Sequence, residues 1–169
     1  MRFLTIFRLL LTALWLGCAV FFIGVAESAF SGLDVPEIAN GRELAGAVVN
    51  RNLTIVNLSG LIIGAILILT SFWGTKNLSR IGAWTERVLL ILMTAACAVG
   101  QFVIITWMSF IRSQLGKPLV EVAADDPLLI KFNQLHQYSQ WVLLTAMITA
   151  LLAFFVISLK SDTNVTETK

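Results

Sequence analysis

The sequence predicts an all-α integral membrane protein, a four-helix bundle whose helices run up-down-up-down through the bilayer. Apolar residues make up 57% of the chain and charged residues only 13%, whereas charges are about a quarter of a soluble domain. The mean hydropathy is +0.85. Four segments are apolar over about 20 residues, enough to cross a hydrocarbon core of about 30 Å. In 169 residues these segments leave little room for a soluble domain.

We expect a single domain over residues 1–160 and a flexible cytoplasmic tail over residues 161–169. The first span begins after Arg2, and Arg8 is expected to extend to the membrane surface beside the apolar run. About eighteen uncharged residues follow, too many for the apolar core of a signal peptide, so we expect the segment to be retained. The predicted spans are residues 3–25, 53–74, 88–111 and 141–159.

The second helix is expected to run from residue 41 to about residue 73, after a polar loop over residues 27–40. Asn40 followed by Glu43 resembles a capping box, which marks a helix start. Only residues 53–74 need to lie in lipid, so the helix extends beyond the outer membrane surface. A connection over residues 74–87 leads to the third span, and a second loop covers residues 113–125.

The last helix also extends beyond the outer surface. Asp126 is a suitable N-cap and Pro127 suits the first helical position. Neither proline nor glycine follows before Lys160, and no charge lies between Trp141 and Leu159. The helix is therefore expected to be continuous over residues 126–160.

Small residues at heptad spacing predict where the helices touch, because close backbone approach stabilises packing in lipid. On the first helix this criterion selects Ala13, Gly17, Val20, Gly24 and Glu27. The second helix has Gly60 and Gly64 in a small-xxx-small motif. The fourth helix presents one small and polar face at Phe132, His136, Ser139, Leu143, Ala146, Ala150 and Ala153.

Polar residues on these faces predict a funnel that opens at the outer surface. Because the helices alternate in direction, Glu27, Asn50, Arg112 and His136 fall at the same end, beside Arg51 and Ser139. Asn57 and Gln101 lie deeper, and Thr94, Gln101 and Arg112 align on the third helix. One interpretation is a path for an ion or substrate. The other is structural: interhelical hydrogen bonds at Asn57 and Gln101, a packing role for His136, and an ion pair between Glu27 and Arg112.

No catalytic pattern is present. Nucleophile motifs and glycine-rich phosphate loops are missing, and the net charge of +2 gives no reason to expect nucleic-acid binding. Cys18 and Cys97 lie inside spans without metal-binding spacing and read as small core residues. No metal site is predicted. A haem or copper site at His136 is a minor alternative, since Met93, Met108 and Met147 are expected to lie well below it.

The distribution of Lys and Arg predicts that both termini are cytoplasmic and that the protein lies in the cell membrane. Seven basic residues fall on the side of the termini and five on the opposite side. The seven are Arg2, Arg8, Lys76, Arg80, Arg87, Lys160 and Lys169; the five are Arg42, Arg51, Arg112, Lys117 and Lys131.

Two short motifs carry a family resemblance. The run Leu14-Trp15-Leu16-Gly17 with Phe21-Phe22 resembles the opening of the transmembrane protein 205-like family, and Phe132-x-x-Leu135-His136-x-x-Ser139 is similar to its Leu-His-x-x-Ser signature. The resemblance implies a small four-span membrane protein without an established activity, sometimes linked to resistance phenotypes. The chain departs from the family at Glu27, where a proline often closes the first span. At the level of the fold it also resembles four-span copper-resistance membrane domains.

Three hypotheses for function follow. The first is a non-enzymatic structural or assembly component of the membrane, whose partners are the lipid bilayer and a second copy of the chain or a larger membrane complex. The second is a transporter or permeation component that uses the polar funnel. The third is a haem- or metal-binding redox subunit.

Overall fold

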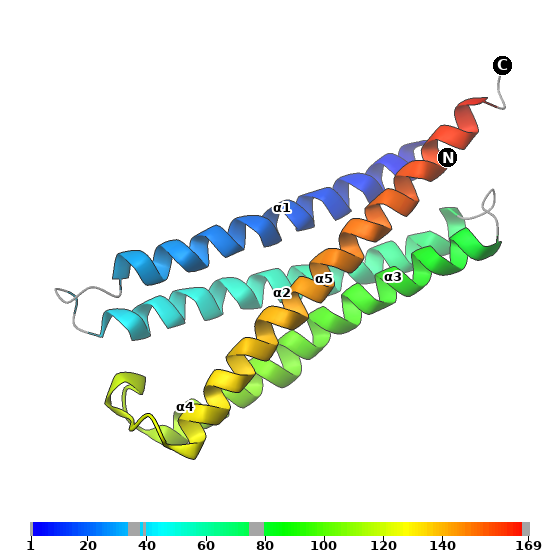
Figure 1. The fold of residues 1–169 in the computed structure, drawn as a ribbon. Coiled ribbons are helices and arrows are strands. Elements are labelled where there is room, and N and C mark those ends of the chain that lie inside the picture. Colours follow the sequence, from blue (N-terminus) through cyan, green and yellow to red (C-terminus); the bar gives the residue numbers. More distant parts are fainter. Residues whose placement is uncertain (1, 34–37, 39, 75–79, 167–169) are drawn as a thin grey trace.

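The computed structural model describes residues 2–33, 38, 40–74 and 80–166. Within these ranges the backbone is helical or irregular, with no strand. The helices are α1 (Arg2–Leu33), α2 (Gly41–Gly74), α3 (Arg80–Ala98), the π-helical segment η1 (Val99–Ile105), α4 (Thr106–Leu115), the short 3-10 turn η2 (Leu119–Glu121) and α5 (Pro127–Thr166). The segments α3, η1 and α4 follow one another without a break and form one rod (Figure 1).

The predicted all-α membrane bundle is confirmed: four helices of the described chain are long and apolar enough to cross a membrane. α1 has 32 residues and α5 has 40, which gives lengths of about 48 and 60 Å at 1.5 Å per residue. All four rods are therefore longer than the roughly 30 Å of a hydrocarbon core, whereas the sequence predicted this only for the second and fourth.

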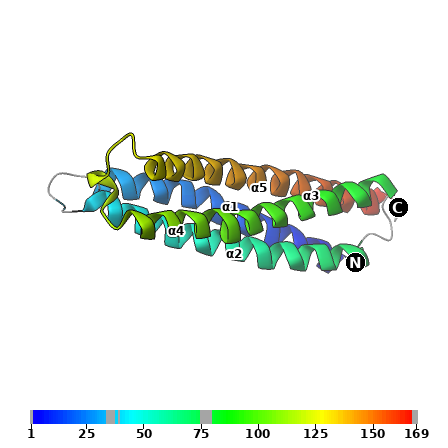
Figure 2. The same cartoon turned by 90° about the horizontal axis from the view of Figure 1, so that it is seen from below.

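Consecutive rods run antiparallel and form a ring in which α1 contacts α2, α2 contacts α3, α3 contacts α5, and α5 returns to α1 (Figures 1 and 2). The first residues of α1 and α3 and the last residues of α2 and α5 lie at one end, here called the terminal end (Figure 1). The α1–α2 and α4–α5 connections lie at the other, the distal end. At the distal end α1 and α2 diverge from α4 and α5 (Figure 1).

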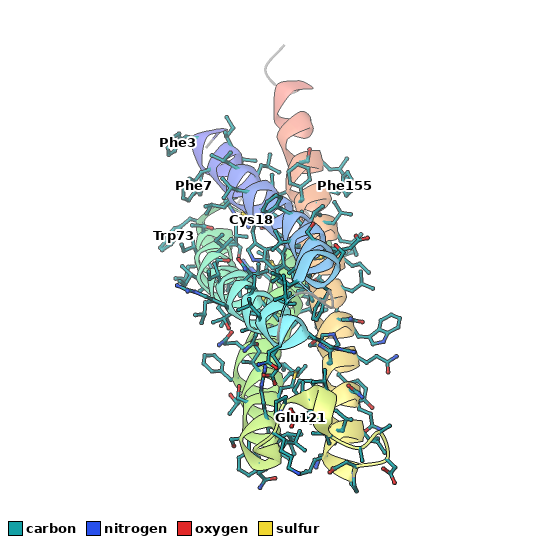
Figure 3. All side chains as sticks on the ribbon, turned by 90° about the vertical axis from the view of Figure 1, so that its left-hand side faces the viewer. Phe3, Phe7, Cys18, Trp73, Glu121 and Phe155 are labelled. Atoms are coloured by element: carbon teal, nitrogen blue, oxygen red, sulfur yellow. The ribbon has the colours of Figure 1, made fainter. Side chains whose placement is uncertain are left out.

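Large apolar side chains point away from the bundle along its whole length. Phe3, Phe7 and Trp73 project outward near the terminal end (Figure 3), and Phe3 is 82% exposed. Exposed apolar surface of this extent suits contact with lipid chains rather than water. Cys18 is exposed as well, so its predicted core role is wrong, while Cys97 is buried as expected.

The face of α1 that packs in the bundle differs from the predicted one. Ala13, Gly17, Val20, Gly24 and Glu27 are all exposed, and a Cβ added at Gly17 or Gly24 meets nothing within 4 Å. The buried face has the same heptad spacing but a different register, and it consists of Arg8, Thr12, Trp15, Ala19 and Phe22. Small size alone selected the wrong register, because a lipid-facing helix tolerates small residues too.

α1 is also longer than predicted. The segment from Glu27 to Leu33 was expected to begin a loop, and it is helical. Ala26, Ala29 and Phe30 pack against the main core, so burial of apolar side chains continues beyond the lipid-spanning stretch. Residues 34–37 and 39, where the rest of this loop was predicted, lie outside the described residues.

The face predicted for α2 is buried only in part. Its members are Asn50, Leu53, Asn57, Gly60, Gly64, Leu67 and Ser71; the last five are buried, Leu53 is half-buried and Asn50 is exposed. A Cβ at Gly60 would lie 2.5 Å from the Cys97 Sγ and 2.8 Å from the Trp15 Nε1. One at Gly64 would lie 2.2 Å from the Thr94 Oγ1. The missing side chains therefore allow α1 and α3 to pack directly on the backbone of α2.

The start of α2 at Gly41 agrees with the prediction, although the local contacts differ from a capping box. Asn40 has a left-handed backbone with φ 59°, and its carbonyl accepts hydrogen bonds from the N–H groups of Glu43 and Leu44. The Glu43 carboxylate lies 3.2 Å from the Arg112 guanidinium of α4. Glu43 thus contributes to a tertiary contact instead of a local cap.

α5 begins as predicted and ends later. The Asp126 carboxylate accepts a hydrogen bond of 2.8 Å from the Leu128 N–H, which confirms the N-cap ahead of Pro127. The predicted small face is confirmed by the burial of Ala146, Ala150 and Ala153. The helix continues to Thr166, beyond its predicted end at residue 160. The flexible cytoplasmic tail over residues 161–169 stays a prediction, and residues 167–169 lie outside the description.

The third rod begins earlier than predicted and changes its helical winding. α3 starts at Arg80, so residues 80–87, predicted as a connection, are helical; residues 75–79 are not described. In η1 the wider winding shifts the packed face, and the adjacent residues Ile104 and Ile105 are both buried. A π-helical turn of this kind often lies at a functional site.

A buried ion pair lies at the terminal end. Arg8 is 1% exposed and Glu86 is 0% exposed, and the Arg8 guanidinium donates to the Glu86 carboxylate and to the Leu67 carbonyl at 3.4 Å. The prediction that Arg8 extends to the membrane surface is therefore wrong. Arg8 points inward because a carboxylate of α3 lies opposite it, as intramembrane charges usually require.

Candidate functional site

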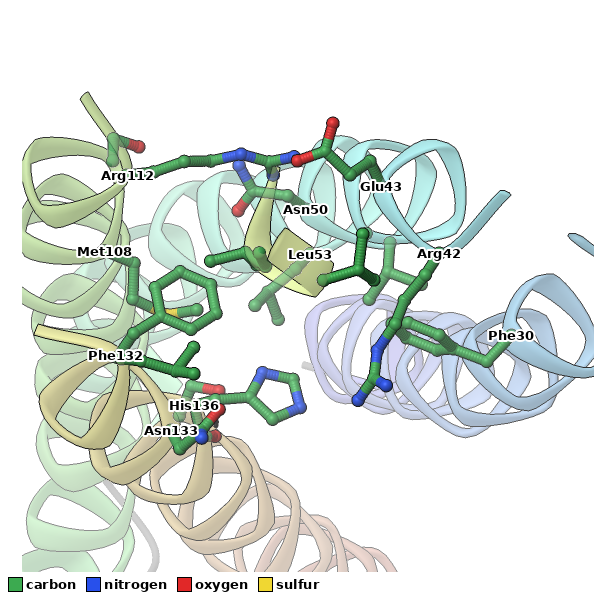
Figure 4. A pocket seen from close by; sticks show the side chains of 17 residues that line it. Phe30, Arg42, Glu43, Asn50, Leu53, Met108, Arg112, Phe132, Asn133 and His136 are labelled. Atoms are coloured by element: carbon green, nitrogen blue, oxygen red, sulfur yellow. Dashed lines mark hydrogen bonds and ion pairs between the residues drawn. The ribbon is translucent and has the colours of Figure 1, made fainter. Parts of the chain in front are cut away.

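A cavity of about 290 Å³ lies at the distal end, lined by residues of α1, α2, α4, η2 and α5 (Figure 4). We call it the distal cavity. Four residues of the predicted funnel line it: Asn50, Arg112, His136 and Ser139. The volume is near the lower limit of small-molecule pockets in proteins, about 300 Å³.

Other predicted funnel residues are elsewhere. Glu27 and Arg51 are exposed and do not line the distal cavity. Asn57 is 3% exposed and packs against Gly100, where an added Cβ would lie 3.0 Å from its Nδ2. The Oε1 atom of Gln101 is buried and has no hydrogen-bond partner among the described residues.

The charges of the distal cavity are unequal in number. Arg112 pairs with Glu43 at 3.2 Å, so the predicted Glu27–Arg112 ion pair is wrong. Arg42, in the first turn of α2, forms no ion pair within the described ranges. Figure 4 shows the Arg42 guanidinium and the His136 imidazole pointing into the same space. Within the described chain, Arg42 thus presents a cationic group to the cavity.

The walls of the distal cavity are largely apolar. Phe30 of α1, Leu53 of α2 and Phe132 of α5 face the space that contains His136 (Figure 4). Leu119 of η2 also lines it, so the α4–α5 connection contributes to the wall. The combination of apolar walls with a few polar groups is typical of binding pockets.

His136 is held by its own helix. Its carbonyl accepts a hydrogen bond of 2.6 Å from the Ser139 hydroxyl, and its Nε2 lies 3.5 Å from the Gln140 Nε2. Met108 lines the same cavity. Among the described residues, no group of three His, Cys, Asp or Glu side chains is placed to hold a metal ion. The haem or copper alternative stays a prediction.

Aromatic residues indicate the depth of the distal cavity. Trp107, Tyr138 and Trp141 are exposed at the distal side, and Trp73 and Trp84 at the terminal side. Trp84 and Trp107 are on the same rod, about 35 Å apart at 1.5 Å per residue. Two such belts mark the membrane–water interfaces. The cavity residues Arg112 and His136 lie near the distal belt, at the boundary between lipid and water.

The sequence prediction missed Arg42 and Asn133, which both line the distal cavity. A signal for Arg42 was present: it precedes Gly46, Val49 and Leu53 at spacings of four, three and four residues, which places all four on one helical face. Asn133 precedes His136 by three residues, again on a shared face.

The fold and the cavity define a multi-pass membrane protein in which a cavity with apolar walls and a few polar groups lies at one end of a four-helix bundle. The chain belongs to the family DUF4149, a domain of unknown function, whose model matches residues 10–117. The match includes most of α1 and all of α2, α3 and α4, and it ends before α5. No curated protein and no solved structure matches the chain. The resemblance to the transmembrane protein 205-like family therefore stays a prediction.

Proposed function

We propose that this protein is a non-enzymatic membrane protein that binds a small ligand in the distal cavity and acts as a transport or permeation component. The observation that carries this proposal is the convergence of Arg42, Asn50, Arg112 and His136 from three helices onto one cavity. A few polar groups that converge in a pocket with apolar walls are typical of ligand-binding sites. Among the three sequence-based hypotheses, the cavity favours transport over a purely structural role.

Access to the cavity supports the proposal. Arg42, Asn50 and Asn133 line it and remain exposed, so a ligand reaches it from the distal side. Below it the bundle is closed, because Val56 and Asn57 are buried. At the terminal end the Arg8–Glu86 pair links α1 to α3. A site open on one side and closed on the other fits one state of an alternating-access cycle.

The proposal also includes the orientation of the chain in the membrane and a family relationship. The excess of Lys and Arg at the terminal end supports cytoplasmic termini in the cell membrane, so the distal cavity faces outward. A reporter fused after Lys169 that is active only in the cytoplasm tests this orientation, and an inactive fusion contradicts it. The motifs around Trp15 and His136 support kinship with the transmembrane protein 205-like proteins.

Filling the distal cavity tests the proposal. Gly46 lines it, and an added Cβ there meets nothing within 4 Å, so Gly46→Phe places a ring in open space. The helix gains up to about 1 kcal/mol because glycine is a poor helix former. Anionic, cationic and neutral amphiphiles are each added to the wild type and to Gly46→Phe. We expect Gly46→Phe to fold normally and to lose the rise in Tm given by whichever class stabilises the wild type.

The control for this experiment is Ile62→Phe, at an exposed position of α2, which keeps the ligand response. An equal rise in Tm in Gly46→Phe and in the wild type would contradict the proposal that the ligand binds in the distal cavity. The same holds when no class of amphiphile raises the Tm of the wild type.

A second candidate function is assembly with another copy of the chain. The favouring observation is the exposed α1 face around Gly17 and Gly24, where an added Cβ meets nothing within 4 Å beyond the adjacent backbone of its own helix. Small residues on a lipid-facing helix allow a second helix to approach closely.

Replacing both Gly17 and Gly24 with leucine is expected to shift the protein toward the monomer, because bulky side chains prevent close helix contact. Light scattering of the protein in lipid nanodiscs gives the oligomeric state. Ile62→Leu, also on an exposed face, serves as the matched control. A wild type that is monomeric, or a double variant that associates like it, rejects this second candidate.

A further inference from the structure

We infer that the ligand of the distal cavity is an amphiphile with an anionic headgroup, a carboxylate or phosphate bound by Arg42, and an apolar chain against the aromatic walls. The inference rests on the proposed function and names its ligand class. It applies equally to an anionic phospholipid of the bilayer and to a free single-chain anion, because the recognised chemistry is the same.

The sign of the headgroup follows from the charges. Arg42, Arg112 and Glu43 line the cavity, and Arg112 and Glu43 compensate each other at 3.2 Å. Arg42 directs its guanidinium into the cavity (Figure 4) and forms no ion pair with the residues described. A guanidinium offers a planar fork of donors that matches carboxylate and phosphate oxygens. A cationic headgroup would instead lie beside the Arg42 guanidinium, a charge of the same sign.

Neutral donors lie beside this cation. Asn50 and Asn133 line the cavity, and each has an amide NH₂ that donates hydrogen bonds. His136 is close to the Arg42 guanidinium in Figure 4, and a ring N–H is a further donor. The polar part of the cavity is thus rich in donors, as an oxygen-rich anion requires.

We infer the apolar chain of the ligand from the apolar walls of the distal cavity and from the depth of the cavity relative to the membrane. Phe30, Leu53 and Phe132 occupy much of the lining (Figure 4), and a small inorganic anion would leave these surfaces against water. Covering apolar surface contributes about 25 cal/mol per Å². The cavity also lies near the distal aromatic belt of Trp107 and Trp141, where a lipid-like molecule has its headgroup.

The inference is tested on the full chain in phosphatidylcholine nanodiscs with five probes: dodecanoate, dodecyl phosphate, dodecyltrimethylammonium, dodecanol and inorganic phosphate. We expect only the two dodecyl anions to raise the Tm. Arg42→Gln is expected to weaken their binding by about tenfold or more, because hydrogen bonds to charged groups are among the strong ones. Arg42→Lys is expected to lose less, since it retains the charge.

Arg51→Gln is the matched control, because Arg51 is an exposed arginine of the same helix outside the cavity. We expect the Arg51→Gln variant to bind the two dodecyl anions as tightly as the wild type does. The inference is wrong if cationic or neutral probes bind as well as the anions. If binding is also lost in Gly46→Phe but unchanged in Arg42→Gln, the proposed function still holds. If inorganic phosphate binds as well as dodecyl phosphate, the claim that the ligand carries an apolar chain is wrong. Binding unchanged in both variants overturns the proposed function as well.

Native mass spectrometry in nanodiscs with phosphatidylglycerol distinguishes the two sources. Retained phosphatidylglycerol that dodecanoate displaces identifies a membrane lipid, and retention of dodecanoate alone identifies a free single-chain anion. Either result supports the anionic class when Arg42→Gln reduces the retention.

Discussion

Arg8→Met is expected to lower the free energy of unfolding by about 3–5 kcal/mol, the range for breaking a buried ion pair from one side. Arg8 and Glu86 are both almost completely buried and bond to each other between α1 and α3. Removing the guanidinium leaves the carboxylate buried without this counter-charge, and the donation to the Leu67 carbonyl is lost as well. Titration with sodium dodecyl sulfate, followed by circular dichroism, measures the loss.

The double variant Arg8→Met with Glu86→Leu is the control. Replacing a buried pair by apolar residues is often neutral or stabilising by about 1–4 kcal/mol, so the double variant should recover most of the stability. A double variant less stable than Arg8→Met would show that the two side chains do not act as a pair. A single variant as stable as the wild type would show that Arg8 is hydrated rather than buried.

Gly64→Val is expected to destabilise the bundle by about 1–3 kcal/mol or to prevent its folding, the usual effect of adding volume to a packed core. A Cβ at this position lies 2.2 Å from the Thr94 Oγ1 and 3.2 Å from the Thr94 Cβ, so the Thr94 side chain or one of the two helices must shift. Yield of folded protein and the Tm in detergent measure the effect.

Thr94→Ala provides the matching rescue. It removes the hydroxyl that the added Cβ would meet, so Gly64→Ala should be better tolerated in the Thr94→Ala background than alone. Gly24→Ala is the neutral control, because no atom lies within 4 Å of its added Cβ. Equal Tm changes for Gly64→Ala and Gly24→Ala would argue against close packing at Gly64.

Much of the architecture was predictable from local signals. Asp126 and Pro127 fixed the start of α5, and the small residues Ala146 and Ala150 identified its packed face, which the structure confirms. Gly60 and Gly64 did the same for α2. In these cases the capping residues or the small side chains predicted the helix start or the packed face without knowledge of the neighbouring helices.

The distal cavity was predictable in part. Asn50, Arg112, His136 and Ser139 were placed together by counting helical turns and directions, and all four line it. Arg42 was missed, although it contributes the cationic group without an ion pair in the described chain. Glu27 was misplaced because the register of α1 was wrong, and its supposed partner Arg112 pairs with Glu43.

The sequence by itself determined the class of this protein: four apolar helices, their direction and the end at which polar residues gather, since these follow from hydropathy, length and capping residues. Only the tertiary structure decided which side of α1 faces the bundle, that Arg8 meets Glu86, and which arginine is available in the distal cavity. In a membrane both lipid and protein neighbours are apolar, so hydrophobic periodicity does not separate the packed face from the lipid face. The decision depends on side chains brought together from different helices.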